Sequence, residues 1–250
     1  MPDIWSAALA TPGLGWLLLT IAIAGLVRGF TGFGTALIFV PVAGQFLPPQ
    51  QIILLVTITG IFSNAVLLPR AWRSADRAEV GLLAGVAILT VPIGLWALRQ
   101  VDPLVIRWVV AAVASVTLLA VITGWQWRGR LGRRGLGVIG GSAGFFGGMT
   151  GLTGPVVIMF YLANARSAEK VRANTILFLA SLDVVIITYL LLQGQMTWLV
   201  VTVGILLAMP YMLTSLIGQR LFDPSLERMY RVVAYCVVGL AVMTGLPLFD

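Results

Sequence analysis

The strongest constraint on the fold is the near absence of charge from ten long apolar stretches of the chain. A helix that spans a bilayer needs about 20 mainly apolar residues. Only 10% of the 250 residues are charged and 59% are hydrophobic, whereas a soluble domain carries about 25% charged residues. The sequence therefore predicts an all-α, polytopic membrane protein within the lipid bilayer. The predicted segments are 13–28, 33–47, 51–69, 80–98, 104–124, 136–147, 153–164, 171–192, 196–217 and 228–248.

A glycine-rich motif occurs twice, and its copies open two halves of similar pattern. The first reads RGFTGFGT at 28–35, the second reads GGMTGLTGP at 147–155, and their central threonines lie 119 positions apart. We therefore predict an internal duplication within one integral membrane domain, with a first repeat at 1–127 and a second at 128–250. Three further matches follow in the same order at spacings of 118 to 121: Pro92 with Pro210, Asp102-Pro103 with Asp223-Pro224, and Thr123-Gly124 with Thr244-Gly245.

Loop charges predict how the two halves face. Cytoplasmic loops carry the arginine and lysine excess in membrane proteins. All four arginine-rich loops lie in the cytoplasm only if the chain enters and leaves each glycine region on the same side of the membrane. The two helical segments around each motif would then form a re-entrant hairpin or two full crossings. We therefore expect two inverted repeats of about five helical segments each, with broken or re-entrant helices at the motifs. The rival arrangement, eight helices in parallel halves, would place one arginine-rich loop outside. Arginine-rich loops are 70–77, 128–134, 166–172 and 220–231, and uncharged ones are 47–50 and 193–197.

Broken helices in inverted repeats are typical of secondary transporters, whose solute site lies near the bilayer midplane. Irregular backbone at that depth must be buried in protein or line a wet cavity. The amino terminus of a half-helix offers unpaired N–H groups and a partial positive charge, which favour an anion. Alternatively, the threonines bond back to helix carbonyls and the glycines allow close helix packing. The substrate-binding candidates in the motifs are Gly29, Thr31, Gly32, Gly34, Thr35, Thr150, Gly151, Thr153 and Gly154.

Arg28 is the candidate anion clamp, because it lies between apolar segments beside the first motif. An unpaired cation in the membrane costs several kcal/mol, and the planar guanidinium suits a pair of sulfonate, sulfite or carboxylate oxygens. The alternative is an arginine at a helix end that reaches to the interface. The second copy has Gly147 at this position, so any charge would lie on one side of the site.

Asp183 is a candidate for proton coupling, because it lies midway along an apolar segment. A carboxylate there is a partner for Arg28, a proton carrier or a structural group between helices. Asn64 lies 119 positions earlier and either donates to a solute oxygen or joins helices. Asn174, near the start of a segment, suits capping or loop contacts instead.

Several function classes are excluded by residues that the chain lacks. It has no histidine and one cysteine, which removes the commonest metal ligand, the commonest general base and any internal disulfide. We expect Cys236 to be a small buried hydrophobe. No phosphate loop indicates an ATP-driven pump, and no paired carboxylates indicate an enzyme. We predict no cofactor and no metal.

The net charge of +7 does not indicate nucleic-acid binding, since the arginines lie in short loops between apolar segments. The acidic start of the chain lacks the basic region of a signal peptide, so we expect the first segment to be retained. Tryptophans mark several segment ends, as in an interfacial belt. They are Trp16, Trp72, Trp96, Trp108, Trp125, Trp127 and Trp198.

The paired motifs, GLVRGFTGFGTALIFVPV and GFFGGMTGLTGPVVIMFYLAN, together with the duplication and the length, resemble the sulfite exporter TauE/SafE family of membrane permeases. The resemblance covers nearly the whole chain. It implies an inner-membrane transporter of a small sulfur-containing anion such as sulfite, sulfoacetate or another organosulfonate. The motif glycines and threonines carry over by position, and the oligomeric state stays open.

We therefore expect a secondary transporter, an exporter, that works by alternating access around the two broken helices. An anion channel that shares the site, or a permease for another small organic acid, is the alternative. A membrane enzyme or a non-transporting scaffold fits less well, because Arg28 and Asp183 lie within the membrane segments.

Overall fold

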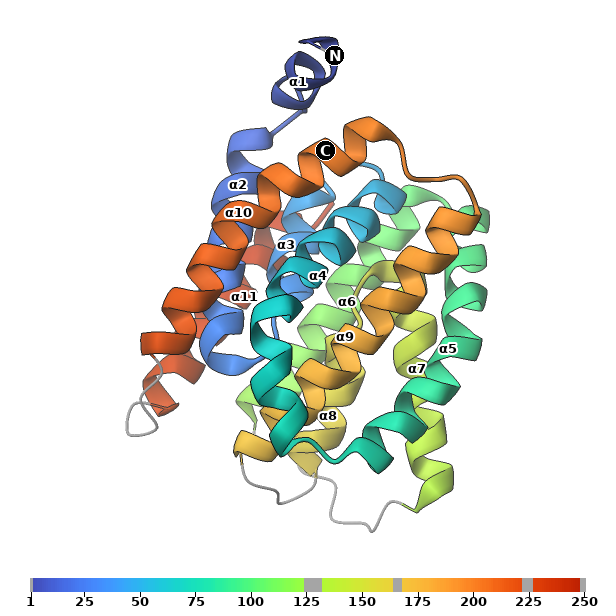
Figure 1. Ribbon diagram of the computed structural model, residues 1–250, viewed down its shortest axis with the longest axis vertical. Coiled ribbons are helices and arrows are strands. Elements are labelled where there is room, and N and C mark those ends of the chain that lie inside the picture. The colour runs from blue at the N-terminus through green and yellow to red at the C-terminus, as the bar shows by residue number, and fades with distance from the viewer. Residues whose placement is uncertain (1, 124–131, 164–167, 222–226, 248–250) are drawn as a thin grey trace.

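The computed structural model describes residues 2–123, 132–163, 168–221 and 227–247, and over these the chain is helical with no strand (Figure 1). Each of the ten predicted segments is a helix, so the all-α prediction is confirmed; the short α1 was not predicted. The helices are α1 (Pro2–Leu9), α2 (Leu14–Thr31), α3 (Thr35–Ala43), α4 (Pro49–Ser74), α5 (Arg77–Gln100), α6 (Pro103–Ile122), α7 (Arg133–Thr150), α8 (Gly154–Ala163), α9 (Ala168–Leu192), α10 (Trp198–Leu221) and α11 (Glu227–Gly245). Predicted features at Gly124, Trp125, Trp127, Arg128, Arg130, Arg166, Asp223 and Pro224 lie outside the described residues.

Helix lengths separate spanning helices from half-helices. Six described helices are long and apolar enough to cross a membrane: α2, α4, α5, α6, α9 and α10. By contrast, α3 has 9 residues and α8 has 10, about 14 and 15 Å at the usual helical rise. Each glycine region therefore consists of an 18-residue helix followed by a helix of about half that length. This arrangement is intermediate between the two predicted alternatives, a re-entrant hairpin and two full crossings.

The described parts of the four arginine-rich loops lie at one end of the molecule, the lower end in Figure 1. Contacts between Ser74 and Glu169 and between Asp76 and Asn174 join the α4–α5 turn to the start of α9 there. The uncharged turns between α3 and α4 and between α9 and α10 lie at the opposite end. We call the lower end the arginine-rich end. Two arginines that the loop comparison left out, Arg99 and Arg107, flank the α5–α6 turn at the other end.

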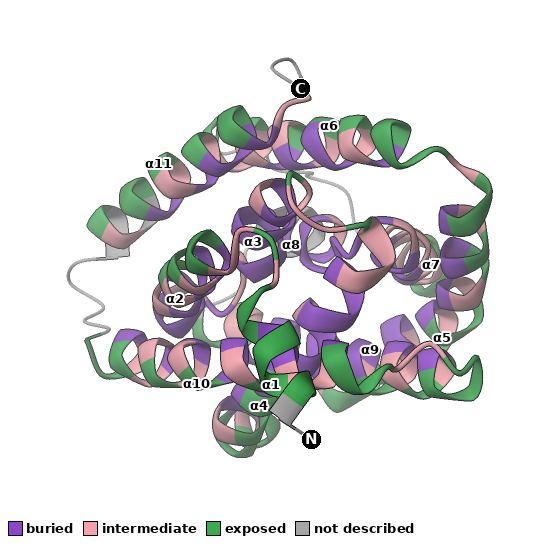
Figure 2. Ribbon diagram, turned by 90° about the horizontal axis from the view of Figure 1, so that it is seen from above, coloured by how far each residue is buried: buried purple, intermediate pink, exposed green. Residues whose placement is uncertain are grey.

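The helices form three layers when viewed along the long axis (Figure 2). One outer layer contains α6 and α11, the other contains α10, α4, α9 and α5, and the layer between them contains α2, α3, α8 and α7. The most extensive contacts pair α2 with α10 and α7 with α5, and α4 packs against α9. The two half-helices therefore lie in the interior, where the other elements shield their ends from lipid.

Glycines allow the two closest helix pairs to pack backbone against backbone. A methyl group at Gly25 would lie 2.6 Å from the Tyr211 carbonyl oxygen, and one at Gly144 would lie 2.6 Å from that of Ala87. Gly29 and Gly148 likewise face the carbonyls of Ser215 and Val91, each at 2.4 Å. In these matching contacts the glycines of α2 and α7 are 119 positions apart, whereas the residues they face on α5 and α10 are 124 positions apart.

The proposed match of Pro92 with Pro210 is therefore wrong, because the two prolines occupy different levels of their helices. Equivalent contacts instead pair Thr90 with Thr214. Part of this change comes from the turns, since the turn between α4 and α5 covers only residues 75–76, whereas the turn between α9 and α10 covers 193–197. These three extra residues account for three of the five positions by which the offset changes.

Candidate anion-binding site

The first helix break depends on two glycines in left-handed conformations. Gly32 ends α2 with φ 83° and Gly34 precedes α3 with φ 102°, a region that residues with a side chain rarely adopt. The Thr31 hydroxyl donates to the Val27 carbonyl at 2.8 Å and accepts from the Phe33 N–H at 3.2 Å. Thr31 therefore satisfies the backbone of the break.

The second break repeats the threonine contacts but has one left-handed glycine among its described residues. Gly151 ends α7 with φ 77°. The Thr150 hydroxyl donates to the Phe146 carbonyl at 2.7 Å and accepts from the Leu152 N–H at 3.2 Å. The alternative interpretation thus holds for Thr31 and Thr150, whose hydroxyls stabilise the breaks.

Both half-helices begin at the same interior cavity. Its lining comes from the start of α3, the start of α8, the middle of α4 and α9, and single residues of α2 and α10. The first N–H groups of a helix have no partner within the helix, and no side chain caps α3. The second half offers fewer such donors, since Pro155 lacks an N–H. The lining residues are Arg28, Gly34, Thr35, Ala36, Leu37, Val56, Gly60, Thr153, Gly154, Pro155, Ile158, Leu179, Asp183 and Tyr211.

Arg28 supplies a buried cation to this cavity. Its side chain is 4% exposed, so it does not reach out to the interface as the alternative interpretation held. One Nη atom donates to the Asn64 Oδ1 atom at 2.7 Å, and the buried Nε–H has no partner. A guanidinium has five N–H donors, so most of the donor capacity of Arg28 remains for a ligand.

Asn64 connects Arg28 to Asp183. Its amide nitrogen donates to the Asp183 Oδ2 atom at 2.8 Å, and Asp183 is 7% exposed. Asn64 and Asp183, which are 119 positions apart like the two motif threonines, thus meet each other where α4 crosses α9. Gly60 makes room for the carboxylate, because a methyl group there would lie 2.4 Å from Oδ2.

Tyr211 is a cavity residue that the sequence analysis missed. It is fully buried, and its hydroxyl shares a hydrogen bond of 2.6 Å with the Thr35 hydroxyl. Ala87 occupies the equivalent place in the first half. The only available signal was a lone tyrosine after Pro210 in an apolar segment, which by itself indicates packing as readily as binding.

Six of the predicted site residues line the cavity: Arg28, Gly34, Thr35, Thr153, Gly154 and Asp183. Asn64 lies between Arg28 and Asp183 and bonds to both. Others lie elsewhere: Gly29 packs against α10, and Gly32 and Gly151 lie in the breaks. Asn174 bonds to the Asp76 N–H and to Glu79, as expected for a loop contact. In contrast to the expectation, Cys236 is exposed. Within the described ranges, no group of three or more His, Cys, Asp or Glu residues could hold a metal ion.

Comparison with known protein families gives a match to "Sulfite exporter TauE/SafE" over residues 17–244. The chain belongs to the TauE/SafE family. The matched region contains both glycine motifs and every residue of the cavity. No curated protein and no solved structure matches the chain. Together with the six long apolar helices, family membership identifies a multi-pass membrane protein of a transporter family.

Proposed function

We propose that this TauE/SafE protein is a secondary transporter that exports a small sulfur-containing anion, sulfite or an organosulfonate, across the cytoplasmic membrane. One observation carries the proposal. The amino ends of both half-helices open onto one interior cavity, and the buried, largely unpaired guanidinium of Arg28 lines the same cavity.

The donors around the cavity suit an oxyanion. The cavity is lined by Arg28, whose Nε–H has no partner, by the start of α3, and by Thr35 and Tyr211. Guanidinium and helix amino ends both favour negative charge. Several donors around one cavity suit a ligand with several oxygens on one atom, as in sulfite and sulfonates.

Two features support alternating access between inverted repeats. First, α4 ends where α9 begins, at the arginine-rich end, so the two helices related by the duplication run in opposite directions (Figure 1). Second, the two breaks are made in the same way by Thr31 and Thr150. Inverted halves with broken helices let a transporter expose one site to each side in turn. Domain limits at 1–127 and 128–250 remain part of this proposal.

Asp183 is the candidate proton carrier of this mechanism. The charges of Arg28 and ionised Asp183 sum to zero, and Asn64 lies between the two side chains. An arriving monoanion adds one negative charge inside the membrane, and a proton on Asp183 would compensate for it. Buried, unneutralised charge is costly, so anion and proton binding would be linked.

The test is sulfite binding to purified protein by isothermal titration calorimetry, with sulfoacetate and acetate as comparison ligands. We expect Arg28→Ala to weaken sulfite binding on the order of 100-fold, because charge-assisted hydrogen bonds are lost. Arg28→Lys should restore only part of the affinity, since lysine keeps the charge but loses the planar fork. Arg133→Ala, at an exposed arginine, is the control. Unchanged binding in folded Arg28→Ala protein would exclude the anion clamp.

A channel would share this site but need no closing motion. Flux measured against sulfite concentration in proteoliposomes separates the two mechanisms. Saturating flux is expected of the transporter, and non-saturating conductance with single-channel steps would contradict it.

A further inference from the structure

Three buried hydroxyls have no hydrogen-bond partner within the described residues. Ser63, Thr175 and Ser215 are each 1% exposed, and none of their hydroxyl oxygens makes a hydrogen bond. A hydroxyl inside a helix commonly donates to the carbonyl four residues earlier, as those of Thr57 and Thr117 do here. Because a buried polar group without a partner is destabilising, we expect the three hydroxyls to have a partner other than the helix backbone.

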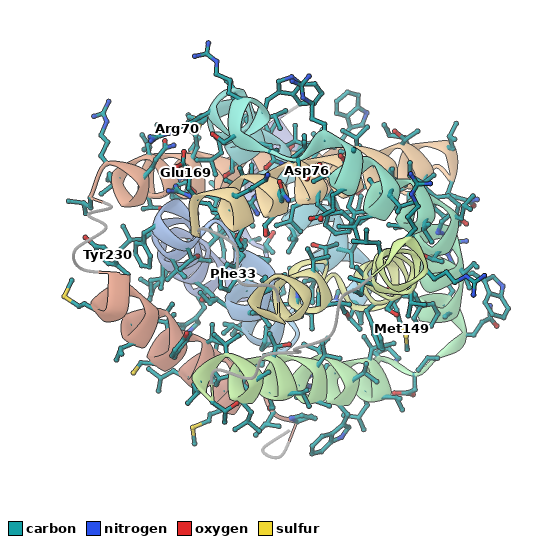
Figure 3. All side chains as sticks on the ribbon, turned by 90° about the horizontal axis from the view of Figure 1, so that it is seen from below. Phe33, Arg70, Asp76, Met149, Glu169 and Tyr230 are labelled. Atoms are coloured by element: carbon teal, nitrogen blue, oxygen red, sulfur yellow. The ribbon has the colours of Figure 1, made fainter. Side chains whose placement is uncertain are left out.

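All three hydroxyls lie beside the central cavity, on the side of the arginine-rich end. Each belongs to a residue three or four positions from a cavity residue of the same helix, and therefore to the same helix face, about 5 Å farther along the axis. Helices α4 and α10 run toward the arginine-rich end, whereas α9 runs away from it (Figure 1). Figure 3 looks onto this end, where Arg70 and Glu169 mark the ends of α4 and α9. The pairs of cavity residue and hydroxyl residue are Gly60 with Ser63, Leu179 with Thr175, and Tyr211 with Ser215.

Hydrogen-bonding groups therefore continue beyond the cavity. The Tyr211 hydroxyl bonds to that of Thr35 at the start of α3. The Ser63 hydroxyl lies near the Tyr211 hydroxyl but makes no hydrogen bond with it. Ser215 follows one turn farther along α10, and Thr175 comes from the facing side, on α9.

The corresponding positions in the other half are apolar. At the spacing of 119 positions, Ser63 corresponds to Leu182 and Thr175 to Val56. At the spacing of 124 that relates α5 to α10, Ser215 corresponds to Val91. Leu182 and Val91 are fully buried. The hydroxyls toward the arginine-rich end thus have no counterpart among these side chains.

We propose that Ser63, Thr175 and Ser215 line the route by which a small oxyanion moves between the central cavity and the arginine-rich end. Their hydroxyls donate to the anion in place of the water that it gives up inside the protein. They therefore act on the rate of passage and not on the affinity of the site at Arg28. This inference rests on the proposed transport of an anion through the cavity.

The experiment measures sulfite flux in proteoliposomes for Thr175→Val and Ser215→Ala. Each variant is expected to lower the saturating flux about two- to tenfold, as for the loss of one neutral hydrogen bond. The dissociation constant for sulfite from calorimetry should stay unchanged. The unfolding temperature should not fall, because the hydroxyl that is removed has no partner in the folded protein. Thr117→Val is the matched control, since it removes a buried hydroxyl on the outer helix α6, and it should leave the flux unchanged.

A second measurement tests the side to which the route leads. Thr175→Cys, combined with Cys236→Ser, is treated with a membrane-impermeant sulfonated methanethiosulfonate in inside-out and in right-side-out vesicles. We expect Thr175→Cys to react from the arginine-rich face and not from the other face.

Equal reaction from both faces, or none from either, would overturn the route. So would unchanged flux in both Thr175→Val and Ser215→Ala, or reduced flux with a lower unfolding temperature, whereas sulfite binding that depends on Arg28 would still uphold the central site. Absence of any sulfite or sulfonate transport by the unmodified protein would instead refute the proposed function and this inference with it.

Discussion

Replacing Gly60 with alanine tests the position of the Asp183 carboxylate directly. The added methyl carbon would lie 2.4 Å from Oδ2 and 3.0 Å from the carboxyl carbon of Asp183. To reach an ordinary contact distance the carboxylate must retreat by roughly 1 Å. Such a movement lengthens the 2.8 Å hydrogen bond from Asn64 beyond the usual range of about 2.7–3.2 Å.

The expected loss of stability follows from two opposing effects. A hydrogen bond to a charged group contributes roughly 1.5–3 kcal/mol. Alanine in place of glycine inside a helix stabilises by about 0.8–1.0 kcal/mol, and position 60 lies well within α4. Gly60→Ala should therefore lower the free energy of unfolding by roughly 0.5–2 kcal/mol.

The assay combines thermal unfolding of the detergent-purified protein with sulfite binding at several pH values. Gly85→Ala is the matched control, because this helical glycine has no neighbouring side chain or other helix within 4 Å; it should be neutral or slightly stabilising. Gly60→Ala should unfold at a lower temperature than Gly85→Ala and show an altered pH dependence of binding. If Gly60→Ala is as stable as Gly85→Ala and binds sulfite with unchanged pH dependence, the carboxylate does not lie against α4 as described.

Two further substitutions separate the roles of the cavity side chains. Tyr211→Phe removes the hydroxyl that bonds to Thr35, and a neutral hydrogen bond contributes roughly 0.5–1.5 kcal/mol. We therefore expect sulfite affinity, measured by calorimetry, to fall by about two- to tenfold; unaltered affinity would show that the hydroxyl does not contact the anion. Asp183→Asn keeps the shape of the side chain but cannot ionise, so the pH dependence of sulfite transport in proteoliposomes should differ from that of the unmodified protein. Normal pH dependence in that variant would rule out proton carriage by Asp183.

The helices and the breaks could be predicted because each has a local physical cause. Long uncharged stretches must be buried in lipid or protein, and clustered glycines with threonines do not suit an uninterrupted helix. Asn64 and Asp183 were identifiable because polar groups in apolar segments are rare.

The rotation of each helix could not be predicted, because membrane helices are apolar on every side and their hydrophobic pattern does not indicate an inward face. Tyr211 and Cys236 illustrate the problem, since one is fully buried and the other exposed. The changed offset between α5 and α10 likewise depends in part on the length of a turn, and the match of Pro92 with Pro210 did not indicate it. Backbone contacts at glycines such as Gly25 and Gly144 resolve it.

Three chemical differences between corresponding positions each give the cavity a polar side chain on one side of the match only. Arg28 corresponds to Gly147 and Thr35 to Gly154, while Tyr211 occupies the place of Ala87. A duplicated scaffold can exchange the conformations of its halves between two states of similar packing. The side chains, however, remain on their own half, so the two states differ in the contacts that close them.

The closure at each break is where this difference has its largest effect. At the first break Arg172 donates a hydrogen bond to the Gly29 carbonyl, and at the second Gly151 faces the apolar side chains of Ile53 and Val40. Water and anions compete for the hydrogen bond of Arg172, whereas they do not compete for apolar contact. The two breaks therefore differ in chemistry, because an arginine lies at the first where isoleucine lies at the second.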